Sequence, residues 1–185
     1  CNEEDRGLAL IEKIRVENGN PAAVATILQF LEQKKLLETA LTLALDAIHY
    51  FPLHFALAKR TAQVLMENGE YERADFCLKL VHPLENNDKD YFVLKSLSAL
   101  QSNLSTFPIG AKKGNDAGLN SILDDLKRLD EDDLWRGLIE AEVFALQGSL
   151  ALGVDKFREL IFKNSLGKNR QDLWRAQAGL AQILL

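Results

Sequence analysis

The residues that could carry out acid–base, nucleophilic or metal chemistry are few, and they form no recognisable catalytic group. The three histidines, His49, His54 and His82, are accompanied by no carboxylate pair, and neither an HExxH segment nor paired Cys/His spacings occur. No serine lies in a GxSxG segment, and no GxxxxGK[ST] loop is present for phosphate binding. The sequence therefore predicts a protein that is not an enzyme and that holds no metal or cofactor.

The two cysteines are too few for a disulfide framework. Cys77 lies between Phe76 and Leu78 at an apolar helical position, so we expect a small buried thiol rather than a reactive one. Cys1 has two interpretations that stay open. It is either the lipid-modified first residue of a mature bacterial lipoprotein or a position inside a longer chain at which this segment begins.

The charge and hydrophobicity of the chain narrow the class of partner. A net charge of −5 and a pI near 5.3 argue against nucleic-acid binding, which usually requires a basic face. With 47% hydrophobic residues the chain can bury a continuous core, and no run approaches the roughly 18 apolar residues of a transmembrane helix. We expect a cytoplasmic protein or, if Cys1 is lipidated, a periplasmic protein that is anchored to the membrane.

Two stretches that lie 34 residues apart carry similar residues at matching places. A period near 34 is typical of stacked helix-turn-helix units, because each unit buries its apolar face against its neighbours. The sequence therefore predicts an all-α solenoid, a class whose concave surface typically binds other proteins. The matching pairs are Leu31 and Leu65, Leu37 and Tyr71, Ala40 and Ala74, Leu43 and Cys77, and Ala47 and Val81.

Apolar residues at three- and four-residue spacing predict helices along most of the chain. Asn20-Pro21 is typical of a helix start, Asn68-Gly69 of a tight turn, and His82-Pro83 of a helix end. The acidic turn Asp130–Asp133 is expected to cap the helix that follows it. The expected helices span 4–17, 21–34, 37–50, 54–67, 71–82, about 89–101 and about 117–129, and two longer units follow.

Three features mark the second half of the sequence. The segment 102–116 holds Pro108 and two glycines and lacks a helical period, so we expect a long loop, either a mobile insertion or a ligand cover. The tetrapeptide Asp-Leu-Trp-Arg occurs at 133–136 and again at 172–175, and each copy is expected to open a helix whose tryptophan packs between neighbouring helices. The apolar end at Leu184 and Leu185 implies a continuing chain or an oligomer that forms through the C-terminal helix.

These features resemble the tetratricopeptide repeat (TPR) family, well over 21–88 and loosely over 134–185. The resemblance implies a right-handed α–α superhelix in a single domain, 1–185, as part of a longer chain. Its repeats would span 21–54, 55–88, 89–133 with the inserted loop 102–116, 134–170 and a partial unit, 171–185. The residues that carry the resemblance are Ala40, Ala44 and Pro52, then Gly69, Tyr71, Ala74 and Leu78, then Gly148, Leu150, Gly153 and Phe157, and finally Trp174 and Ala178.

In TPR proteins the first helix of each unit lines the concave groove. The resemblance therefore implies binding of a protein or peptide there, with Lys59, Arg60 and Gln63 donating hydrogen bonds to its carboxylates or backbone. Chaperone-binding members hold a terminal carboxylate with a Lys/Asn clamp, most of which is missing here. The implied contacts are Gln29, Glu32 and Gln33 in one repeat and Lys59, Arg60, Gln63 and Glu67 in the next.

Three functional hypotheses follow. The first is a non-enzymatic scaffold that binds a protein or an extended peptide in its groove. The second is a bacterial envelope lipoprotein, anchored through Cys1, that assists the assembly of pilus, secretion or exopolysaccharide machinery. The third is the substrate-recognition arm of an enzyme whose catalytic domain lies outside this sequence.

Overall fold

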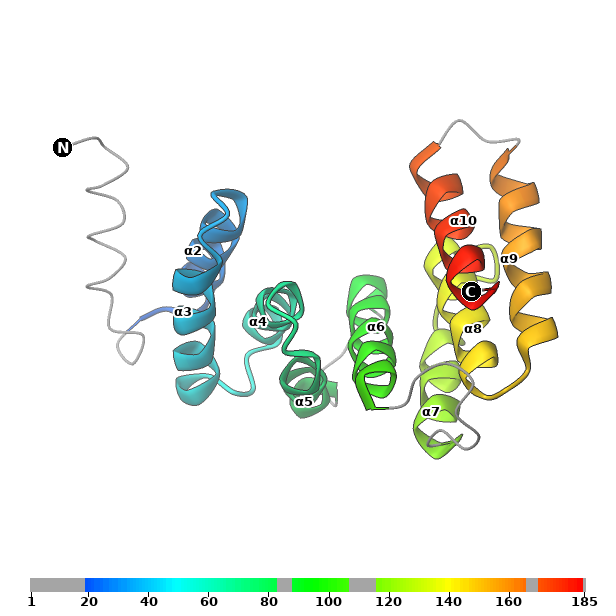
Figure 1. Ribbon diagram of the computed structural model, residues 1–185. Coiled ribbons are helices and arrows are strands. Elements are labelled where there is room, and N and C mark those ends of the chain that lie inside the picture. Colours follow the sequence, from blue (N-terminus) through cyan, green and yellow to red (C-terminus); the bar gives the residue numbers. More distant parts are fainter. Residues whose placement is uncertain (1–18, 83–87, 107–115, 166–169, 185) are drawn as a thin grey trace. The chain divides into compact units, whose positions relative to one another are not determined.

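A computed structural model of the chain describes residues 19–82, 88–106, 116–165 and 170–184. Within these ranges the regular structure consists of nine α-helices without a β-strand (Figure 1), which confirms the predicted all-α class. None of these described helices combines the length and the hydrophobicity that a membrane span requires. The expected first helix, 4–17, and Cys1 lie outside the described residues.

The chain divides into two compact units, Cys1–Asn86 and Asn87–Leu185. In the first unit four helices have nearly the predicted bounds. Asn20 caps the first of them as predicted, because its side-chain oxygen accepts the N–H of Ala22 at 2.9 Å and Pro21 is the first helical residue. The four helices are α2 (Pro21–Gln33), α3 (Leu37–Tyr50), α4 (Phe55–Glu67) and α5 (Tyr71–Val81).

An apolar core holds the first unit together. Helix α2 packs against α3 and α4, α3 packs against α4, and α4 packs against α5. The buried positions recur every three or four residues, so they share one side of each helix and leave the polar residues on the other sides. Leu28 and Leu31 of α2, Ala40 and Ala44 of α3 and Leu57 of α4 are completely buried.

Three helix hairpins turn in the same way. The residue after each helix cap has a positive φ: 58° at Lys35, 78° at Gly69 and 83° at Gly148. The next N–H in each turn donates to a carbonyl five residues earlier, at 3.0 Å, 2.8 Å and 2.8 Å respectively. This pattern is the Schellman motif, which satisfies the last carbonyls of a helix. Its occurrence at Lys35 and at Gly69 has the spacing of 34 residues that the sequence pattern predicts.

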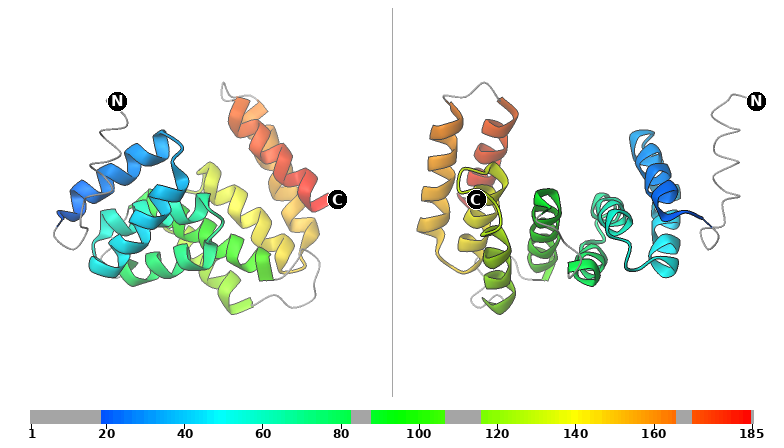
Figure 2. Two further views of the ribbon diagram at one scale, coloured as in Figure 1. Left: turned by 60° about the vertical axis from the view of Figure 1, so that its left-hand side comes forward. Right: turned by 180° about the vertical axis from the view of Figure 1, so that it is seen from behind.

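The second unit contains five described helices that follow the same packing order. Helix α6 packs against α7 and α8, α7 against α8, α8 against α9 and α10, and α9 against α10 (Figure 2). Phe157 of α9 is completely buried in a cluster with Leu138, Ala141 and Ala176. The helices are α6 (Lys89–Thr106), α7 (Asp116–Leu126), α8 (Leu134–Leu146), α9 (Leu150–Ser165) and α10 (Arg170–Leu184).

The predicted loop 102–116 is wrong at both ends, because α6 continues to Thr106 and α7 begins at Asp116. Pro108, the two glycines and the lack of a helical period led to the predicted loop, but the serine and asparagine residues before Pro108 extend α6, although their side chains can compete for backbone hydrogen bonds. Here Asn103 donates its side-chain N–H to the carbonyl of Ala99 at 2.7 Å within the helix. Residues 107–115 of the predicted loop lie outside the described residues.

The two Asp-Leu-Trp-Arg segments take different positions. The first opens α8 as predicted, with Asp133 as the N-cap residue. The second lies inside α10, which already begins at Arg170.

The tryptophans of these segments differ as well. Trp135 packs against the Phe157 cluster as predicted, whereas the prediction is wrong for Trp174, which is 67% exposed. Trp174 lies two residues before the buried Ala176, and two residues turn a side chain by about 200° around a helix. The face of α10 that packs in the unit therefore excludes Trp174.

Candidate functional site

The polar residues that the sequence predicts as groove contacts lie on α2 and α4, which pack against each other. Gln29, Gln33 and Glu67 are exposed. Lys59, Arg60 and Gln63 of α4 are partly buried, as is Glu32 of α2. The structure therefore brings residues of both predicted repeats into one unit. We call the surface formed by Gln29, Glu32, Gln33, Lys59, Arg60, Gln63 and Glu67 the α2–α4 face.

An ion pair joins the two helices of this face. Arg60 Nη1 of α4 donates to Glu32 Oε2 of α2 at 2.8 Å, and the two side chains are 29% and 10% exposed. From the resemblance, Arg60 is expected to donate hydrogen bonds to the carboxylates or the backbone of a partner. The structure instead places a carboxylate of the same chain against this guanidinium, so Arg60 holds Glu32 in position.

The second oxygen of Glu32 is in a different situation. Glu32 Oε1 is buried and has no hydrogen-bond partner among the described residues. Burial, the largest cause, raises the pKa of Glu32 above its ordinary value, the charge of Arg60 opposes this, and the charge of Glu67 raises the pKa further. Glu32 thus combines one oxygen that is paired with Arg60 and one oxygen that is buried without a hydrogen bond in the described part of the chain.

The side chain of Lys59 points towards the N-terminal end of α4. Its ammonium nitrogen lies 5.6 Å from the centre of the Phe55 ring, at the first residue of the helix. Lys59 and Glu67 are eight residues apart on α4, about 12 Å along the helix axis. Lys59 thus lies near the N-terminal end of α4, and Glu67 lies at its C-terminal end.

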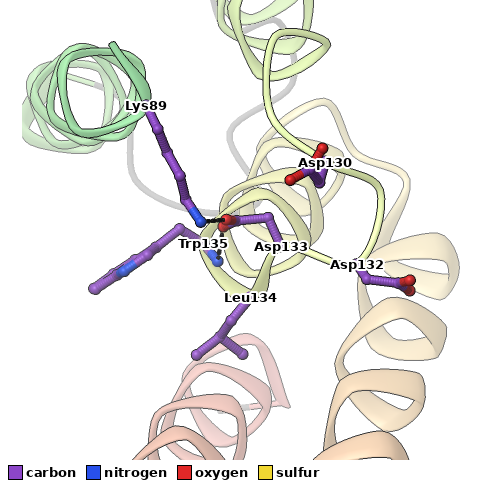
Figure 3. A pocket seen from close by; sticks show the side chains of 6 residues that line it. All are labelled: Lys89, Asp130, Asp132, Asp133, Leu134 and Trp135. Carbon is purple, nitrogen blue, oxygen red and sulfur yellow. Dashed lines mark hydrogen bonds and ion pairs between the residues drawn. The ribbon is translucent and has the colours of Figure 1, made fainter.

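A hollow of about 430 Å³ lies in the second unit beside the N-terminus of α8 (Figure 3). Asp133 Oδ1 accepts the N–H groups of Trp135 and Arg136 at 2.9 and 3.3 Å, and Oδ2 is paired with Lys89. Both oxygens of Asp133 are thus used to cap α8 and to join it to α6, which confirms the predicted capping role. The other residues that line the hollow are Asp130, Asp132 and Leu134.

Glu142 of α8 was not singled out by the sequence. Burial raises the pKa of its carboxyl group, and no charged group contributes to the shift. Glu142 lines a niche of about 10 Å³, about the size of one water molecule, together with Leu104 of α6, Ala145 and Leu146 of α8 and Gly179, Gln182 and Ile183 of α10. This carboxyl group therefore sits in largely apolar surroundings.

Two of the residues that could carry chemistry, His54 and Cys77, have structural roles, whereas His49 and His82 are exposed. His54 Nδ1 accepts the N–H of Leu57 at 3.3 Å as the N-cap of α4, and Cys77 is buried as predicted. In the described ranges, no three His, Cys, Asp or Glu side chains are grouped so that they could hold a metal ion. Burial raises the pKa of the Cys77 thiol to about 11, which makes this cysteine a poor nucleophile at neutral pH.

Comparisons with protein families, with curated proteins and with solved structures find no match to this chain. The resemblance to the TPR family therefore stays a prediction from the residues.

Proposed function

We propose that the chain is a non-enzymatic protein–protein interaction scaffold that binds a protein or an extended peptide on the α2–α4 face. The observation that supports this proposal is the ion pair between Glu32 and Arg60, which joins the polar sides of two packed helices, α2 and α4. Amides of Gln29, Gln33 and Gln63 can donate to and accept from a peptide backbone, so the face suits an extended segment.

The order of helix contacts supports a solenoid of the kind that presents such faces. In each unit a helix packs against the next helix, and α2, α6 and α8 also pack against the helix after that. The three Schellman turns repeat the same hairpin geometry. Helical-repeat proteins stack in this way and use the surface along their first helices for binding.

The experiment is a pull-down with the purified chain, read by mass spectrometry, beside two matched variants. The first carries Gln29→Ala, Lys59→Ala and Gln63→Ala and spares Arg60, whose loss would leave Glu32 unpaired. The second carries Thr42→Ala and Asp46→Ala on the exposed side of α3. We expect a protein that the wild type and the α3 variant retain and the α2–α4 variant loses. Equal capture by all three would place binding elsewhere and contradict the proposal.

A further inference from the structure

Glu142 of α8 is a partly buried carboxyl group on which no described charged residue acts. Glu140, two residues earlier on the same helix, is different, because its two oxygens pair with Arg136 and Lys156. Burial alone raises the pKa of Glu142. Its negative charge is therefore partly desolvated without a compensating positive charge, which costs free energy in the folded unit.

The niche beside Glu142 lies where three helices of the second unit meet. Leu104 of α6, Leu146 of α8 and Ile183 of α10 make its walls mainly apolar. Gln182 of α10 is the other polar side chain that lines it. Gln182 is exposed, and Glu142 and Leu104 are partly exposed, so the niche can be reached from solvent on this side.

The niche suits a primary ammonium group in charge and in size. Its volume of about 10 Å³ accommodates one water-sized group, and an ammonium group is compact, whereas the planar guanidinium of arginine is larger. The carboxylate of Glu142 and the side-chain oxygen of Gln182 can accept its N–H bonds, and the apolar walls can contact a methylene stem. Because the carboxylate is already partly desolvated, a cation that reaches it is attracted more strongly than in water.

We propose that the niche between α6, α8 and α10 binds the ammonium group of a lysine side chain of a partner protein, with Glu142 as the carboxylate that holds it. The site lies within the second unit and does not depend on the proposed binding at the α2–α4 face. It gives a role to a carboxylate whose burial disfavours its charge. Residues that bind ligands often reduce stability in this way.

The test is an NMR titration of the purified chain with lysine, arginine and norleucine, each blocked at both backbone ends. Blocked lysine should shift the methyl signals of Leu104, Leu146 and Ile183. It should also lower the pKa of Glu142, read from its side-chain carboxyl carbon signal, because a cation favours the ionised form. Blocked norleucine has a similar stem without the charge, and blocked arginine has a larger head group, so both should bind at least about tenfold more weakly.

Three variants separate the charge of the niche from its size and from the charge of the whole unit. Glu142→Gln keeps the shape of the side chain and should weaken the binding of blocked lysine at least about tenfold. It should remain folded, because burial disfavours the charge that it removes. Leu104→Ala removes part of the wall and should let blocked arginine bind as tightly as blocked lysine. Glu131→Gln, at an exposed position, is the charge control and should leave all three affinities unchanged.

Each contrary outcome overturns a stated part of this inference. Binding of blocked norleucine as tightly as blocked lysine would show that the niche takes apolar groups and that the ammonium assignment is wrong. Equal losses in Glu142→Gln and Glu131→Gln would reduce the effect to the net charge of the unit. If none of the probes shifts the signals of the niche, the site does not exist, whereas the pull-down at the α2–α4 face tests the proposed function independently.

Discussion

Gly153 of α9 lies against the carbonyl group of Ala141 of α8, so closely that a β-carbon on Gly153 would stand 2.8 Å from that oxygen. The oxygen belongs to the backbone of a buried helix and cannot move aside alone. The glycine therefore sets the distance between two helices whose shared core holds Phe157. It is also one of the residues that carry the TPR resemblance.

We expect Gly153→Ala to destabilise the fold by about 1–3 kcal/mol, although alanine normally favours a helix interior by about 1 kcal/mol. The added methyl group must push α9 away from α8. Urea denaturation followed by circular dichroism measures the change. Gly137→Ala is the control, because its β-carbon would meet only the end of the flexible Leu160 side chain, at 2.7 Å. A stabilised Gly153→Ala variant would show that the close approach is absent.

The turn between α2 and α3 uses a residue type that suits its backbone poorly. Lys35 has a φ of 58°, whereas the same position in the other two Schellman turns is glycine. Because a side chain at positive φ is strained, Lys35→Gly should stabilise the fold by about 1 kcal/mol. Thermal unfolding of this variant beside Lys35→Ala checks the cause. The alanine variant also removes the charge but keeps the strain, so an equal gain in both would refute the backbone explanation.

The helix bounds of the first unit were predictable because their signals are local. Asn20-Pro21 and Asn68-Gly69 each satisfy or redirect the backbone of a helix end within a few residues, so the sequence around them is sufficient. The end of α6 was not predictable in this way. Its Ser102–Thr106 segment has the composition of a loop, and Leu104 contributes to a niche that residues of α10 complete.

In the candidate site, too, local sequence patterns predicted the helix side on which a residue lies but not the residue that it contacts. Sequence spacing placed Arg60 and Glu32 on polar sides of their helices, but these residues are 28 positions apart. Only the packing of α2 on α4 shows that they pair with each other. Glu140 and Glu142 illustrate the limit further, since they lie two residues apart on α8 and have opposite surroundings.

Removal of the Arg60 guanidinium should lower the stability of the fold through its effect on Glu32. Arg60→Gln leaves a buried carboxylate without its ion-pair partner, so we expect a loss of about 1–3 kcal/mol at neutral pH. The charge and the hydrogen bond of Arg60 both lower the pKa of Glu32, so this pKa should rise further in the variant. A raised carboxyl pKa disfavours the fold at pH values above it, so the loss should shrink as pH falls towards the ordinary value near 4.5.

Denaturation of Arg60→Gln at neutral and acidic pH measures this dependence. Lys59→Gln is the matched control, since it removes the adjacent charge of α4 and should cost less than about 1 kcal/mol with little change over the same pH range. An Arg60→Gln variant as stable as the wild type at neutral pH would contradict the assigned ion pair.

Glu142 should lower the stability of the second unit at neutral pH. Because burial raises its pKa, the folded chain binds the Glu142 proton more tightly than the unfolded chain does. Ionisation of Glu142 therefore disfavours folding most at pH values above its pKa in the folded chain. The stability of the unit rises as the pH falls through that pKa towards the pKa of the unfolded chain, near 4.5. Glu142→Gln should stabilise the unit by about 1 kcal/mol at neutral pH and should remove this part of the pH dependence.

The matched comparison is Glu140→Gln on the same helix. Glu140 Oε1 accepts Arg136 Nε at 2.8 Å, and its Oε2 lies 3.2 Å from Lys156 Nζ, so loss of this carboxylate leaves two cations without their partner. The two substitutions make the same chemical change two residues apart, yet Glu140→Gln should destabilise the unit where Glu142→Gln stabilises it. Urea denaturation of both variants across pH 4–8 measures the difference. If both variants lost stability at neutral pH, the carboxyl group of Glu142 would have a favourable interaction partner. That result would contradict its assignment to largely apolar surroundings in the niche.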